Sequence, residues 1–133
     1  MTDAEFLAAL EACTLPEECF HHRDHVRAAF LYLKQGNPAT AIARFSESLK
    51  RFATSLGKTN LYHETITWAY LLLIHERMAR SEDVRDFEAF AERNADLFAW
   101  RPSVLDRYYR EETLRSELAR RVFVLPDRLS EAK

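Results

Sequence analysis

Hydrophobic residues recur at three- and four-residue intervals along most of the chain, which is the spacing of an α-helix. Thr2 and Glu5 have the spacing of a capping box, and Phe6, Leu7 and Leu10 behind them predict a first helix to about residue 13. A second helix is expected from about residue 21 to Gly36, where glycine can take the left-handed position that ends a helix. No segment shows the alternation that predicts a strand.

The pattern continues in the same way to the C-terminal part of the chain. The further helices that it predicts are 38–57 behind the N-cap Asn37, about 60–79 capped by Thr59 or Asn60, one that opens at Ser81-Glu82-Asp83, and two short ones at roughly 103–110 and 112–121. The helix at about 60–79 is hydrophobic on nearly every side, which is typical of a central, buried helix. We therefore expect an all-α fold, a single-domain up-and-down bundle of five to six helices spanning residues 1–133.

Composition and charge narrow the classes of function. The 133 residues are 47% hydrophobic with only two glycines and four prolines, which favours a compact helical domain over a disordered chain. The net charge of −2 is spread along the chain, so nucleic acid is not an expected partner. The hydrophobic run 68–74 is too short to cross a membrane. Cys13 and Cys19 fit no metal-binding or redox spacing and follow no signal peptide, so we expect a cytoplasmic protein.

The stretch FHHRDHVRAAF, residues 20–30, places three histidines at the start of the second predicted helix. His22 lies four residues before Val26 and His25 four before Ala29, so both continue the hydrophobic stripe of that helix into its first turn. They are expected to face the interior. His21 has a different direction, and whether it takes part in a site is left open.

A second histidine phrase, LYHETITWAYLLLIH, begins the helix predicted at about 60–79. Short connections favour antiparallel neighbours, so this helix and the one that starts at His22 should point the same way and share one end of the bundle. His63 and Glu64 lie at that end. We expect both to look inward toward His22 and His25.

Three imidazoles and a carboxylate form a plausible coordination set for one divalent ion, which could be iron, zinc, copper or manganese. The predicted ligands are His22, His25, His63 and Glu64. Two alternatives are open from the sequence: a metal-free polar or acid–base site, and separate structural roles for the same residues. A polar residue at a helix start often only caps the helix.

The same phrases carry a resemblance to other proteins. FHHRDHVRAA at 20–29, YHETIT at 62–67 and the ending at 105–127 resemble a family of small, uncharacterised bacterial helical proteins. The resemblance implies an all-helical fold and supports the histidines and Glu64 as a shared constellation. It implies no activity.

From these residues we predict a metal-dependent enzyme, an oxygenase or a hydrolase, that acts on a small anionic molecule. Glu64 would be a ligand or the base that activates metal-bound water. Arg101 and Arg107 would anchor the anionic group, and Tyr109 would line the substrate pocket. Two other functions are open: a helical interaction module, because NPATAIARFSESLKRF looks like a tetratricopeptide helix, and a non-catalytic metal-binding protein. The sequence gives no indication of the oligomeric state.

Overall fold

The computed structural model describes residues 1–81 and 86–128, and within these ranges it contains helices and connecting segments without strands. The α-helices are α1 (Asp3–Glu11), α2 (His22–Gln35), α3 (Pro38–Ser55), α4 (Glu64–Arg80), α5 (Phe87–Arg93), α6 (Glu111–Leu114) and α7 (Glu117–Arg121). Four short 3₁₀-helices join them: η1 (Glu17–Cys19), η2 (Thr59–Leu61), η3 (Ala95–Phe98) and η4 (Val104–Arg107). The all-α class is therefore confirmed.

The C-terminal part of the chain is divided more finely than the sequence predicted. The helix expected at 103–110 is only the short η4, and the one expected at 112–121 is split into α6 and α7 because Ser116 caps the second with its side chain. The described residues thus hold seven α-helices where five to six were expected. The predicted helix start at Ser81-Glu82-Asp83 extends outside the described residues, and α5 begins at Phe87 behind Asp86.

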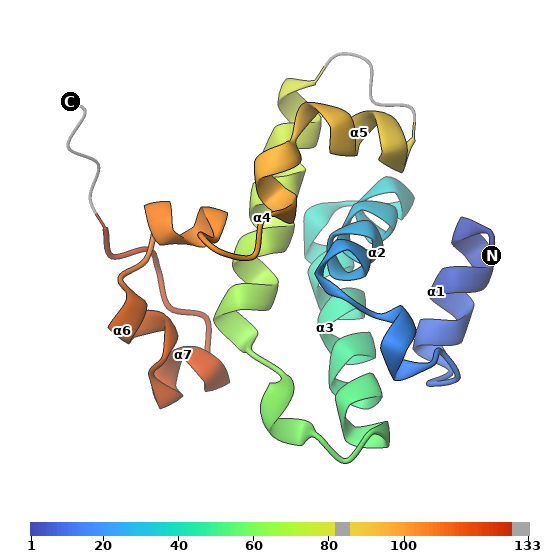
Figure 1. Ribbon diagram of the computed structural model, residues 1–133, viewed down its shortest axis with the longest axis horizontal. Helices are drawn as coiled ribbons and strands as arrows, with labels where there is room; N and C mark the ends of the chain where they lie inside the picture. The colour runs from blue at the N-terminus through green and yellow to red at the C-terminus, as the bar shows by residue number, and fades with distance from the viewer. Residues whose placement is uncertain (82–85, 129–133) are drawn as a thin grey trace.

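Helix α4 is the centre of the fold. In Figure 1, α3 and α4 run side by side in opposite directions, whereas α2 is viewed almost along its axis and crosses them. Helix α7 packs on α4 from another side. Leu71 and Ile74 are completely buried, but Leu72 is 37% exposed, so one stripe of the central helix faces solvent.

Local sequence signals predicted some helix ends correctly and others not. Thr2 and Glu5 form the predicted capping box of α1, and Asn37 caps α3 by accepting a hydrogen bond from the backbone N–H of Thr40 at 2.8 Å. The predicted start of the central helix is wrong by several residues. Thr59–Leu61 forms the separate turn η2, and His63 caps α4 instead.

The two glycines take different conformations at the ends of their helices. Gly36 ends α2 in an extended conformation with φ of −176°, not in the left-handed one. Gly57 takes the left-handed conformation, with φ of +70°, directly after α3. Glycine there permits the sharp turn into η2 at little steric cost.

An extended segment after α7, residues 122–128, runs back along α4. The buried hydroxyl of Thr65 donates to the carbonyl of Val122 at 2.8 Å and accepts from the N–H of Val124 at 3.0 Å. The ring of Phe123 stacks on Trp68 with centroids 5.2 Å apart. This segment is therefore anchored to the first turn of the central helix.

Within the described residues, no helix combines the length and the hydrophobicity that a membrane crossing requires. Cys13 and Cys19 are both free thiols. Cys13 has a positive φ of 60° in the turn that follows α1.

Candidate binding cavity

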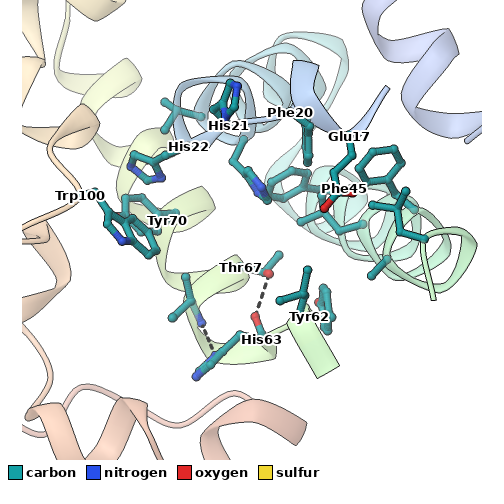
Figure 2. Close-up of a pocket in the computed structure, with 18 residues that line it drawn as sticks. Glu17, Phe20, His21, His22, Phe45, Tyr62, His63, Thr67, Tyr70 and Trp100 are labelled. Carbon is teal, nitrogen blue, oxygen red and sulfur yellow. Dashed lines mark hydrogen bonds between the residues drawn. The ribbon is translucent and has the colours of Figure 1, made fainter. Parts of the chain in front are cut away.

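A cavity of about 560 Å³ lies between the start of α2, the second half of α3 and the start of α4 (Figure 2). Most of its wall is hydrophobic, and its polar side chains are mainly histidines. The lining residues are Glu17, Phe20, His21, His22, His25, Val26, Phe45, Leu49, Phe52, Ala53, Leu56, Leu61, Tyr62, His63, Ile66, Thr67, Tyr70 and Trp100. Residues of both histidine phrases thus line one cavity, although α2 crosses α4 and does not run parallel to it as the sequence predicted.

His25 is the histidine most clearly available to a ligand. Its ring lies against Phe20, with centroids 4.2 Å apart, and lines the cavity. Burial, with a smaller effect of the nearby His22, lowers the pKa of His25 to about 4, so the ring is neutral at pH 7. Among the described residues its ring has no hydrogen-bond partner. One ring nitrogen can therefore donate to a bound molecule and the other can accept.

His22 is partly committed to the protein. Its Nε2 atom lies 2.8 Å from the carbonyl oxygen of Leu97, and because a carbonyl only accepts, Nε2 carries the proton. The ring packs between Tyr70 and Trp100, each with a centroid distance of 5.1 Å. Figure 2 shows these three side chains together at one edge of the cavity. His22 thus joins η3 to the cavity wall and keeps only Nδ1 unassigned.

His63 uses both of its ring nitrogens within the protein. Nδ1 accepts a hydrogen bond from the N–H of Ile66 at 3.1 Å, and Nε2 donates to the carbonyl of Leu114 at 2.7 Å. Burial lowers the pKa of His63, which agrees with a neutral ring carrying its proton on Nε2. In Figure 2 the ring lies at the bottom of the view, well away from His22. Neither nitrogen can bind an ion without breaking one of these bonds.

Glu64 faces a different part of the surface. Its carboxylate accepts a hydrogen bond from the Tyr62 hydroxyl at 2.6 Å and lies 3.9 Å from the Nζ atom of Lys50. Burial and the bond to Glu64 raise the pKa of Tyr62, so the phenol keeps its proton. Glu64 lines a separate polar hollow with Arg120 and Arg121, and it does not line the histidine cavity.

The donor set predicted from the sequence therefore does not converge in this structure. In the described residues no group of three or more His, Cys, Asp or Glu side chains is arranged to hold a metal ion. His63 is occupied by two protein hydrogen bonds, and Glu64 lies outside the cavity. A divalent ion bound by these residues remains a prediction, and their placement in the structure does not fit it.

Of the residues predicted to bind substrate, Arg101 and Tyr109 border the same hollow beside the cavity, whereas Arg107 does not. Tyr109 is buried and donates to the carbonyl of Val124 at 2.7 Å, so it holds the C-terminal segment. Arg107 lies 3.2 Å from the Asp96 carboxylate, which also pairs with Arg77. Arg101 is exposed and lines a second hollow beside the cavity.

The face of the cavity that α3 provides was not predicted from the sequence. Phe45, Leu49, Phe52 and Ala53 line it, and the hydrophobic spacing of α3 identified most of this face only as core. Helical periodicity shows that a face is turned inward, but it does not show whether the opposite wall touches it. Trp100, which follows η3 and which the chain order places at the histidine end of the fold, also lines the cavity.

A scan of protein-family models, a search of curated proteins and a search of solved structures each give no match to this chain. The resemblance drawn from the histidine phrases stays a prediction.

Proposed function

We propose that this protein binds a small, largely apolar molecule in the histidine cavity, with a hydrogen-bonding group of that molecule placed against His25. The observation that carries the proposal is a half-buried imidazole, without a partner among the described residues, on the wall of a hydrophobic cavity of about 560 Å³. Ligand pockets in proteins commonly measure about 300–1,000 Å³ and combine an apolar wall with a few placed polar groups.

The protonation state of His25 limits the chemistry of the ligand. A ring whose pKa is about 4 is neutral at pH 7, and it favours an uncharged hydroxyl, phenol or carbonyl as the group beside it. Phe20, Phe45 and Phe52 on the same wall favour an aromatic or branched hydrocarbon as the remainder. The proposal is therefore recognition of a neutral, apolar group, and it includes no reaction.

The metal-dependent enzyme predicted from the sequence is the competing proposal. It is supported by His22 and His25, two of its predicted ligands, which both line the cavity. It is weakened by the two hydrogen bonds of His63 and by the position of Glu64 outside the cavity. The interaction module has no contact that favours it. For location we propose the cytoplasm, which the free thiols Cys13 and Cys19 support.

Calorimetric titration with a size-matched pair, 2-naphthol and 2-methylnaphthalene, tests the proposal. Both should bind with one-to-one stoichiometry, since they share the hydrocarbon that fills the cavity. The hydroxyl compound should bind about 2- to 12-fold tighter, the value of one net hydrogen bond. His25→Phe should abolish that difference while it retains the binding of the methyl compound.

A cavity-filling variant locates the binding. Ala53 is a buried residue of the cavity wall on α3, so Ala53→Leu should weaken both compounds. Ala43 lies on the exposed face of the same helix, and Ala43→Leu is the matched control that should leave both unchanged. The proposal fails if neither compound binds, or if Ala53→Leu has no more effect than Ala43→Leu.

A further inference from the structure

A second hollow, of about 820 Å³, adjoins the histidine cavity. The two share Ile66, Tyr70 and Trp100 as a common wall. The Tyr70 hydroxyl lies 3.0 Å from the Ser103 hydroxyl, which ties this wall to the start of η4. A ligand that fills the cavity therefore has a second, differently built space directly beside it.

The second hollow is rich in arginine, in contrast to the hydrophobic cavity. Arg101, Arg115 and Arg128 line it, together with the carboxylates of Asp106 and Glu111. Arg115 pairs with Glu111 at 2.6 Å, and this pair is exposed, which makes it easy to exchange for another anion. Arg128 donates to the neutral backbone carbonyl of Asp106 at 2.8 Å, so this bond leaves its charge uncompensated.

Arg101 is the arginine nearest in sequence to the shared wall. It directly follows Trp100, and within the described residues no carboxylate pairs with its guanidinium. Among the described residues that line the hollow, three guanidinium groups therefore stand against two carboxylates, an excess of one positive charge. Guanidinium groups bind phosphate and carboxylate with two parallel hydrogen bonds, so an anion is the ligand that this set fits.

Trp100 separates the two spaces with a ring that is weakly held. The residue is 57% exposed, and its ring contacts His22 at a centroid distance of 5.1 Å. Among the described residues the indole has no hydrogen-bond partner.

We propose that the two spaces bind one amphipathic anion, with its apolar part in the histidine cavity and its phosphate or carboxylate group on Arg101 and Arg115. This inference rests on the proposed function, because it needs the cavity to hold the apolar part. It adds the class of ligand: an apolar molecule with a short linker to an anionic group. The shared wall at Trp100 is where the linker would cross.

The test compares 2-(2-naphthyl)ethanol with its phosphate ester, which have the same apolar part, by calorimetry at about 150 mM salt, where distant charges are screened. The phosphate ester should bind wild-type protein about tenfold tighter than the alcohol, the value of one charge-assisted contact. The double variant Arg101→Gln, Arg115→Gln should remove this advantage and leave the affinity for the alcohol within about twofold, because neutral binding does not use the arginines.

Arg80→Gln provides a matched control. Arg80 pairs with Glu76 at i and i+4, as Arg115 pairs with Glu111, and the two arginine side chains are 75% and 76% exposed. It should retain the full advantage of the phosphate ester. Equal affinity for ester and alcohol in wild type, or an advantage that survives in the double variant, overturns this inference alone. Failure of both compounds to bind overturns the proposed function as well. Tight binding of inorganic phosphate that is not linked to the cavity would show an adventitious ion only.

Discussion

The Nε2 atom of His63 lies 2.7 Å from the carbonyl oxygen of Leu114, 51 residues further along the chain. The same ring caps α4 through Nδ1, so one side chain stabilises the start of the central helix and attaches α6 to it. A histidine that the sequence identifies as a ligand is therefore a structural connection in the folded protein.

Replacement of His63 should show how much this connection contributes to the free energy of unfolding. We expect His63→Ala to lower the free energy of unfolding by about 2–3 kcal/mol, because it removes an N-cap and leaves the partly buried Leu114 carbonyl without its partner. His63→Asn keeps a capping side chain without reaching Leu114, and it should recover about half of the loss. Urea unfolding followed by circular dichroism gives both values. A fully stable His63→Ala protein would contradict the assigned bonds.

Metal content distinguishes a shared metal site at the histidines from a structural role of His63. We expect protein purified without added metal, and then titrated with iron(II), zinc, manganese and copper(II), to hold no stoichiometric ion that depends on both His22 and His63. The physical reason is that both nitrogens of His63 already bond to the protein. Elemental analysis of wild type beside His22→Ala and His63→Ala provides the measurement. Near-stoichiometric metal that is lost in both variants would instead establish the metal site.

The stability of the protein should depend on pH through His25. Well above pH 6.5 the ring is neutral in both the folded and the unfolded states, so its protonation does not lower the free energy of unfolding there. Below about pH 6.5 the unfolded chain binds a proton that the folded ring does not accept until about pH 4, so the free energy of unfolding falls across this window. Urea titrations at a series of pH values should show the fall in wild type.

The matched variant for the pH series is His25→Phe, which has no proton to bind. Carboxylates that are paired in the folded protein, such as Asp96 beside Arg77, also titrate at low pH in both proteins. The difference between the two curves therefore isolates His25. Parallel curves between pH 4 and 6.5 would mean that the ring is not desolvated in the cavity.

The extended segment after α7 should depend on one buried hydroxyl. Thr65→Val keeps the shape of the side chain but leaves the Val122 carbonyl and the Val124 N–H without their partner. We expect a loss of about 1–3 kcal/mol in the free energy of unfolding. Thr54→Val, on the exposed part of α3, is the control and should change stability by less than about 0.5 kcal/mol. Equal effects of the two substitutions would rule out this anchoring role.

Local signals in the sequence located many of the helix ends. The Thr2 and Glu5 capping box and the Asn37 cap lie within one turn of the groups they bond, so neighbouring residues alone decide them. The spacing of His22 and His25 relative to Val26 and Ala29 likewise predicted an inward direction, and both histidines line the cavity. Helical periodicity fixes these directions because it refers only to the axis of one helix.

Only the tertiary structure decided which partners those side chains meet. His63 and Glu64 are adjacent, and the rotation of α4 between α2, α3 and α7 turns Glu64 to Lys50 and Tyr62 while His63 meets Leu114. That rotation results from packing between segments far apart in sequence, which no local pattern records. The sequence by itself therefore determined most of the helices and the inward direction of His22 and His25. The packing of α6 and α7 against α4 converted His63 into a structural link and left His25 facing the cavity.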